Sequence, residues 1–307
     1  MKRTVLHCLP AIVSSNLRTL PRLRPVAGPA YTAVLAADLH TDADPWRDRT
    51  DVLRRALSGI RKRLGRIDAL VLAGDITNCG DEKEYRLLDR LLRRYVRAEA
   101  ILPALGNHDA WHHSDHPNYE IAYRLFRDLC VRCGHRGDEN YYEYADRCCI
   151  YLILGTERTM HNGTYLSNAQ LDWLETRLRL AVRRDRVTVV VNHQATAGRN
   201  GGEASWEEEG QLAVSDRLEK LLTEAAAEAK HPVFFVSGHK HMLSPACVEK
   251  AEGKLTFVNL PSLEYGGGDE HAGTAALLQF RPEDDAPYLS FYDFIRGEPV
   301  PDTELSR

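Results

Sequence analysis

Five short motifs in the 307-residue chain carry side chains that can bind metal ions. In chain order they are Asp38-Leu39-His40, Gly74-Asp75, Gly106-Asn107-His108-Asp109, Asn192-His193 and Gly238-His239-Lys240-His241. Carboxylate and amide oxygens combined with imidazole nitrogens suit zinc, iron or manganese ions. The motifs therefore point to metal chemistry if the fold brings them to one place.

The spacing inside two motifs allows both of their side chains to hold one ion. Residues i and i+2 of an extended segment share a face. Asp38 and His40 can thus reach one ion while Leu39 packs inward, and His239 has the same spacing to His241. Lys240 lies between those histidines, and the same alternation predicts that its side chain points away from the ions.

A glycine precedes Asp75, Asn107 and His239, where it lets the backbone turn closely past a crowded centre. Each motif alone is weak evidence, because Asp, Asn and Gly are also ordinary turn formers at strand ends. The weight lies in their common position, since each follows an apolar segment.

The elements that must position these motifs alternate in type through the first part of the chain. Buried strands are predicted in 31–40, 67–78 and 98–109, with amphipathic helices over 44–66 and 81–97 between them. This alternation is typical of parallel β-α-β units whose helices cover the sheet. Ligands bind beyond the carboxyl ends of such strands, so the motifs should converge there.

The later part of the chain is predicted to add a second layer of sheet. Helices are predicted over 117–133 and 167–184, the latter with Ser167 as its N-cap. Strands are predicted in 140–147, 148–157, 186–194, 231–241 and 254–262, and a hairpin-like pair over 274–282 and 287–297. Because no repeat or Pro/Ser-rich linker interrupts the chain, residues 31–300 are predicted to form one α/β domain, with an N-terminal extension (1–30) and a tail (301–307).

Composition narrows the class of partner and the compartment. A formal net charge of −4 gives no support to binding of nucleic acid or of an anionic membrane. The seven scattered cysteines indicate a reducing compartment, and the first residues make a poor signal peptide. With no apolar run long enough to span a bilayer, a cytoplasmic location is expected.

The order D-x-H, G-D, G-N-H-D, strand-end histidine and G-H-x-H resembles the signature of the calcineurin-like metallophosphoesterases, from about residue 33 to about residue 261. The segment YLSNAQLDWLETRL (165–178) is also similar to the one that these enzymes place before the isolated histidine. The resemblance implies a four-layer α/β/β/α sandwich with two central mixed β-sheets. It also implies a centre of two metal ions, with Mn, Fe and Zn all possible.

Carried onto the matching positions, the resemblance implies a role for each motif residue. The first ion would be held by Asp38, His40 and His241, the second by Asn107, His193 and His239, and Asp75 would bridge both. His108 would stay free of metal near the substrate phosphate, with Asp109 fixing its orientation. A hydroxide bridging the ions would attack phosphorus in line, while His108 stabilises charge or protonates the leaving oxygen.

The resemblance implies hydrolysis of a small phosphoric ester, and the compact GNHD form favours a phosphodiester, as in class III cyclic-nucleotide phosphodiesterases. A phosphomonoesterase, a pyrophosphate-bond hydrolase and a non-catalytic metal-binding scaffold are the alternatives, and the net charge disfavours a nuclease. Loops 194–212 and 262–273, with Trp206 and Tyr265, are predicted to shape substrate choice. The remaining histidines are interpreted as residues without a metal role, among them His112, His113, His116 and His161.

Overall fold

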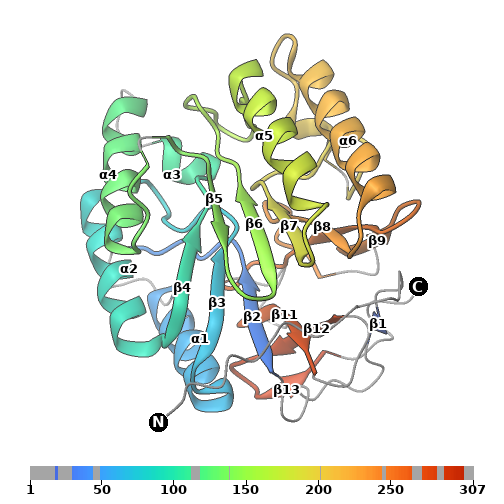
Figure 1. Cartoon of the computed structure of the whole chain (residues 1–307). Helices are drawn as coiled ribbons and strands as arrows, with labels where there is room; N and C mark the ends of the chain where they lie inside the picture. Colours follow the sequence, from blue (N-terminus) through green and yellow to red (C-terminus); the bar gives the residue numbers. More distant parts are fainter. Residues whose placement is uncertain are drawn as a thin grey trace.

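Two β-sheets pack face to face, and helices cover the outer face of each sheet (Figure 1). The computed structural model describes residues 18–19, 30–43, 49–111, 118–137, 139–200, 202–243, 247–264, 272–281 and 287–300. Both sheets contain parallel and antiparallel pairs. The predicted four-layer α/β/β/α sandwich with two mixed sheets is thus confirmed.

The first sheet has the strand order β1-β12-β11-β2-β3-β4, with β13 pairing β12. Strands β2, β3 and β4 are parallel, whereas β11 is antiparallel to both β2 and β12. The strand bounds are β1 Arg18–Thr19, β2 Tyr31–Ala36, β3 Ile67–Leu72, β4 Ala98–Pro103, β11 Thr274–Phe280, β12 Tyr288–Asp293 and β13 Glu298–Pro299.

The second sheet has the order β5-β6-β7-β8-β10-β9. Strands β6, β7, β8 and β10 are parallel, and antiparallel β5 and β9 lie at the two edges. The bounds are β5 Tyr142–Ala145, β6 Cys149–Ile153, β7 Val187–Val191, β8 Val233–Ser237, β9 Val248–Lys250 and β10 Leu255–Asn259.

Helices α1, α2 and α4 pack on the first sheet, and α5 and α6 on the second (Figure 1). A short helix, α3, begins directly after β4. The helix bounds are α1 Arg49–Leu64, α2 Glu82–Tyr95, α3 Asn107–Trp111, α4 Tyr119–Arg132, α5 Asn168–Ala181 and α6 Gln211–Glu228, with a 3₁₀ turn η1 over Glu203–Ser205.

The central strands are largely apolar because both of their faces are covered. In β2, Ala33 and Leu35 lie in the core between the sheets, while Val34 and Ala36 lie in the core under the helices. Successive side chains of a strand point to opposite faces, so a strand covered on both sides reads as a continuous apolar run. The acidic and imidazole side chains therefore follow the end of β2.

Several local predictions are confirmed and others need correction. Ser167 caps α5 by accepting a hydrogen bond from the backbone N–H of Gln170, and β11 and β12 form the expected antiparallel pair. Helix α6 was not predicted, nor was α3 at the G-N-H-D motif. Within the predicted extension, Arg18–Thr19 form strand β1, and residues 1–17, 20–29 and 301–307 lie outside the described residues. Among the helices described, none has the length and apolar character needed to cross a bilayer.

Candidate metal centre

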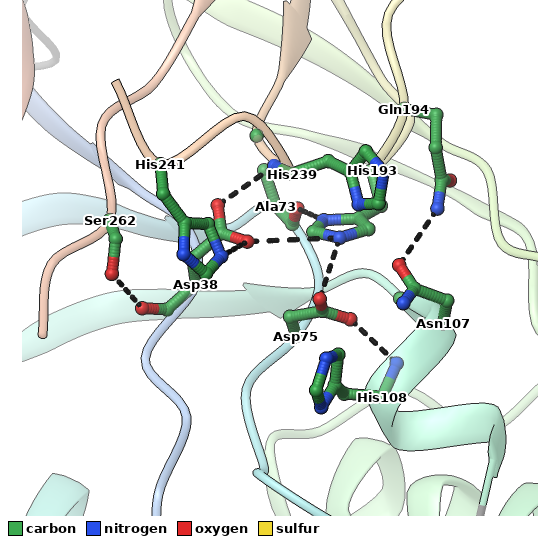
Figure 2. A network of polar contacts seen from close by, with 12 residues as sticks. Asp38, Ala73, Asp75, Asn107, His108, His193, Gln194, His239, His241 and Ser262 are labelled. Carbon is green, nitrogen blue, oxygen red and sulfur yellow. Dashed lines mark hydrogen bonds and ion pairs between the residues drawn. The ribbon is translucent and has the colours of Figure 1, made fainter. Parts of the chain in front are cut away.

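The polar motifs of both sheets meet at one edge of the sandwich. Asp38 and His40 follow β2, Asp75 follows β3, and His193 follows β7 of the second sheet. In Figure 2 these strand ends and the start of α3 surround a common centre, with Asp75 near its middle. The sheets are joined here by the imidazole Nδ1 of His193, which donates to the carbonyl of Ala73 at 2.7 Å.

Most of these motif residues have left-handed backbone, and their side chains point toward the centre. Asp38, His40, Asp75, His239 and His241 have φ values of 53°, 39°, 47°, 72° and 53°. The strand-like i, i+2 geometry expected for the D-x-H and H-x-H motifs is therefore wrong. Asp38 and His40 belong to one cluster of metal-capable side chains although the chain turns left-handed there, whereas His239 and His241 belong to two different clusters. Such a φ is unfavourable for a residue with a Cβ, at roughly 1–3 kcal/mol each, and strain of this kind collects at functional sites.

The first cluster of metal-capable side chains contains Asp38, His40, Asp75 and His241. The Nε2 atoms of His40 and His241 are 2.9 Å apart, and Asp38 Oδ1 lies 3.0 Å from Nε2 of His241. Asp38 is fully buried, and its backbone carbonyl accepts a hydrogen bond from Ser262 Oγ at 2.8 Å. These donors face one another closely enough to share a single ion.

The second cluster contains Asp75, His193 and His239, so Asp75 belongs to both. Asp75 Oδ2 lies 3.0 Å from Nε2 of His193, while its Oδ1 accepts a hydrogen bond from the backbone N–H of His108 at 2.8 Å. The backbone N–H of His239 donates a hydrogen bond to Asp38 Oδ2 at 2.9 Å, which connects a residue of the second cluster to one of the first. One buried carboxylate thus lies between two donor sets.

Glycines before two of the motif residues make room for ligand side chains from other strands. A Cβ on Gly74 would lie 2.5 Å from the ring of His193, and one on Gly106 would lie 2.2 Å from Asp75 Oδ1. Neither approach is possible for a larger residue, and Gly74 also has a φ of 86°. The prediction that glycine allows close passage of the backbone is confirmed at both positions.

Two of the candidate ligand histidines favour the neutral form that metal binding requires, and a third favours the protonated form. Burial lowers the pKa of His40 and of His239 to about 4, so both rings are neutral, as a ligand imidazole must be. Burial opposes the charge on His193 as well, but Asp75 and Asp38 outweigh it and raise its pKa to about 10. The centre therefore attracts a cation, and a proton on His193 competes with a metal ion for the same carboxylates.

The two ring nitrogens of His193 have different surroundings, as expected for a metal ligand. Nε2 of His193 is buried and makes no directed hydrogen bond, whereas its Nδ1 is held by the Ala73 carbonyl. A ligand histidine typically donates its other ring N–H to a carbonyl or carboxylate in this way. The oxygen and imidazole donors, their burial and this tautomer together fit a pair of metal ions.

Asn107 opens α3 beside Asp75 and is held by contacts that the sequence did not indicate. Its Nδ2 donates to the backbone carbonyl of His161 at 2.8 Å, and its Oδ1 accepts from Gln194 Nε2 at 3.0 Å. His161 was interpreted as a residue without a metal role, and it is its backbone carbonyl that holds Asn107. Gln194 directly follows the predicted ligand His193, and that adjacency was the one signal available in the sequence.

His108 is held through one ring nitrogen, which leaves the other available. Its Nδ1 donates to the backbone carbonyl of Asn78 at 2.7 Å, and its ring meets that of His40 edge-on, with centroids 4.7 Å apart. A carbonyl can only accept, so Nδ1 carries the proton. Nε2 is then the atom of His108 that can act on a bound molecule.

The hydrogen bonds of Asp109 reach the backbone near Asp75, although the sequence interpretation had this residue fix the orientation of His108. Its Oδ1 accepts from the N–H and the hydroxyl of Thr77, at 2.8 and 2.6 Å, and its Oδ2 accepts from the N–H groups of Gly106 and Ile76, at 2.9 and 3.2 Å. The carboxylate thus joins the loop after β3 to the loop after β4. The expected role in orienting His108 is corrected to a brace for the backbone around Asp75.

The predicted specificity loops are only partly described. Trp206 is buried and donates its indole N–H to the carbonyl of Ala195, so it belongs to the core and not to a substrate surface. Tyr265, together with His112, His113 and His116, lies outside the described residues.

A two-sheet sandwich with two donor clusters sharing one aspartate has the architecture of a two-metal hydrolase. The family model for calcineurin-like phosphoesterase matches residues 31–243. The match takes in more than half of the chain, and the protein belongs to this family of hydrolases.

A curated relative and two solved structures place the protein further. It is 28% identical over 137 residues to glycerophosphodiester phosphodiesterase GpdQ of Enterobacter lignolyticus (strain SCF1), a stretch that covers 45% of this chain and less than half, 44%, of that relative. A dimetal phosphatase from Danio rerio aligns with a TM-score of 0.58 and 15% identity over 89% of this chain and 97% of that one. Purple acid phosphatase PPD1 from yellow lupin (Lupinus luteus) seeds aligns with a TM-score of 0.59 and 15% identity. The alignment covers 88% of this chain and 52% of that one. At this identity the two structures show a shared fold.

Proposed function

We propose that the protein hydrolyses a small phosphodiester at this centre with two bound metal ions. The observation that carries the proposal is that Asp75 belongs to both donor clusters. One carboxylate with two oxygens can hold two adjacent ions, and a second such residue is not needed. Asp38, His40 and His241 would complete the first ion site, and Asn107, His193 and His239 the second.

When bound, such ions supply positive charge for the phosphoryl oxygens and activate water for attack on phosphorus. The chain's own residues would do the rest. His108, fixed through Nδ1 on the Asn78 carbonyl, would act as imidazolium, whose Nε2–H can stabilise developing charge or pass its proton to the leaving oxygen. Asp109 holds the backbone that follows Asp75 and the neighbouring loop at Gly106 in place, so that the carboxylate of Asp75 would need no rearrangement.

The preference for a diester is supported by the similarity to a glycerophosphodiester phosphodiesterase. A phosphomonoesterase is the alternative, because the same centre can serve both reactions. A non-catalytic scaffold of the same fold is less well supported, since every motif residue is in place and the backbone strain at Asp38, His40 and Asp75 is retained.

The metal, the compartment and the partners belong to the same proposal. Oxygen and imidazole donors are compatible with Mn, Fe or Zn. No disulfide joins the described cysteines Cys79, Cys130, Cys133, Cys148, Cys149 and Cys247, which supports a cytoplasmic location. The net charge of −4 supports a small phosphorylated substrate over nucleic acid or a membrane.

The test compares two chromogenic substrates on protein stripped of metal and reloaded with Mn²⁺, Fe²⁺ or Zn²⁺. The kcat/KM for bis(4-nitrophenyl) phosphate should exceed that for 4-nitrophenyl phosphate. It should collapse in Asp75→Asn but persist in Asp51→Asn, an exposed aspartate on α1. A preference for the monoester would establish the phosphatase alternative, and bound ions without turnover of either ester would establish the scaffold.

A further inference from the structure

Gln194 forms a buried clamp between the candidate metal centre and a neighbouring loop (Figure 2). Its side-chain Nε2 donates both to Asn107 Oδ1 and to the backbone carbonyl of Gly163, each at 3.0 Å. Asn107 is in turn held at its other end, because Nδ2 donates to the carbonyl of His161 at 2.8 Å. Gln194 and Asn107 are each only 1% exposed.

Two backbone carbonyls determine the orientation of both amides. The Gly163 carbonyl can only accept, so the atom of Gln194 that faces it must be the NH₂ group. The His161 carbonyl likewise requires the NH₂ group of Asn107. The oxygen of Asn107 therefore faces Gln194, and a flipped amide would bring oxygen against oxygen at His161.

We infer that Gln194 is a positioning residue for the second ion site, acting through the side-chain oxygen of Asn107. An amide oxygen has two acceptor positions, and the Gln194 hydrogen bond uses one and leaves the other for an ion. The inference rests on the metal pair of the proposed function and adds a residue that touches neither substrate nor ion.

Such a contact should matter because Asn107 is the one neutral oxygen donor among the candidate ligands. A neutral amide is attracted to a cation less strongly than a carboxylate, so its contribution depends more on being held in the right orientation. Partners that orient metal ligands typically change affinity by about 10–100-fold when they are removed. The loss should fall on the ion site of Asn107, His193 and His239.

The experiment is a double-mutant cycle read out by Mn²⁺ affinity, measured by calorimetric titration of metal-free protein. Gln194→Met removes the donor at similar size, and Asn107→Ala removes the group on which it acts. Alone, Gln194→Met should weaken the second Mn²⁺ by about 10–100-fold. In the Asn107→Ala background it should have little further effect. Loss of the Gly163 contact occurs in both backgrounds and therefore cancels.

A variant of the first site identifies which binding step is affected. His241→Ala should weaken the other Mn²⁺, and that step should stay unchanged in Gln194→Met. If Gln194→Met does not fold, Gln194→Glu serves instead, because it keeps the shape but turns an acceptor toward Asn107. Equal losses for both ions, or equal losses in both backgrounds, would overturn the inference.

The outcome also separates this inference from the function on which it rests. If Asn107→Ala weakens one Mn²⁺ but Gln194→Met weakens none, the metal centre stands and only the role of Gln194 fails. If neither Asn107→Ala nor Asp75→Asn changes Mn²⁺ binding, the proposed centre itself fails.

Discussion

The Nε2 atoms of His40 and His241 lie 2.9 Å apart, although the two residues are 201 positions apart in the chain. Both have left-handed backbone, and Asp38 Oδ1 lies 3.0 Å from Nε2 of His241. Burial keeps the His40 ring neutral by lowering its pKa to about 4. The fold therefore brings ring nitrogens and a buried carboxylate together at a point where a proton or a metal ion relieves their repulsion.

Removal of metal should consequently destabilise the folded protein. An ion that binds only the folded state stabilises it by about 2.7 kcal/mol when its concentration is 100 times the Kd. Urea unfolding in excess Mn²⁺ should therefore give a clearly higher midpoint than unfolding in EDTA. Identical midpoints would show that the folded centre holds no Mn²⁺.

Asp75→Asn should weaken both ions at once, because it removes the charge shared by the two clusters. Turnover should collapse while the secondary structure, measured by circular dichroism, persists. Asp51→Asn, the same substitution on an exposed part of α1, should bind both ions normally. Loss of only one ion in Asp75→Asn would contradict the bridging role.

His108→Ala should leave both ions bound, since the His108 side chain is tied to Asn78 and not to the donor clusters. Turnover should fall by about 10²–10⁴, the range that general acid catalysis commonly contributes. Turnover should fall more for esters with poor leaving groups than for nitrophenyl esters, because a poor leaving group needs a proton to depart and nitrophenolate does not. An equal loss for all leaving groups would show that His108 only stabilises phosphoryl charge, and loss of an ion would make it a ligand.

Glu84→Gln should change how stability depends on pH. Glu84 is buried in α2, where its Oε2 accepts from the N–H of Cys79 at 2.8 Å, and burial together with Asp81 and Asp42 raises its pKa to about 7. A raised pKa favours the protonated folded state, so this contribution is complete below about pH 4.5 and is lost as pH rises through 7.

Relative to Glu84→Gln, the wild-type protein should therefore become less stable as the pH rises from 4.5 to 7. The loss should reach about 3 kcal/mol, because each unit of pKa difference corresponds to about 1.4 kcal/mol. Urea unfolding in EDTA across this range keeps metal binding out of the comparison. Parallel stability curves for the two proteins would show that folding does not raise the pKa of Glu84.

Much of the fold could be predicted because its strands are covered on both faces. In β2 and its neighbours, continuous apolar runs end abruptly in polar motifs, and parallel strands place those ends at one edge. Helix α6 could also have been predicted from the sequence, because its buried residues recur at helical spacing, namely Leu218, Leu221, Leu222 and Ala225.

The details of the site could not be predicted because they depend on contacts between distant loops. Gln194 meets Asn107 across 87 positions, and the partner of its second hydrogen bond is a backbone carbonyl, which has no side-chain signature. The left-handed turns at Asp38 and His241 were equally hidden, because propensity favours extended or helical backbone for such residues. Tertiary packing determined these features.

Asp109→Asn tests the largest correction that the structure makes to the sequence interpretation. The carboxylate accepts four hydrogen bonds from Gly106, Ile76 and Thr77, whereas an amide has one oxygen to accept and turns an NH₂ group toward backbone N–H donors. Each buried donor left without a partner costs about 1–3 kcal/mol. The free energy of unfolding in EDTA should therefore fall by at least about 2 kcal/mol on this scale.

Because Ile76 and Thr77 directly follow the strained Asp75, Mn²⁺ binding should weaken in Asp109→Asn as well. Asp51→Asn, whose carboxylate is half-exposed, should stay within about 0.5 kcal/mol of the wild-type stability. If Asp109 instead oriented His108, its substitution would leave stability and ion affinity unchanged and reproduce the leaving-group dependence of His108→Ala. We expect the reverse, because the hydrogen bonds of Asp109 end on the backbone next to Asp75, the residue that belongs to both donor clusters.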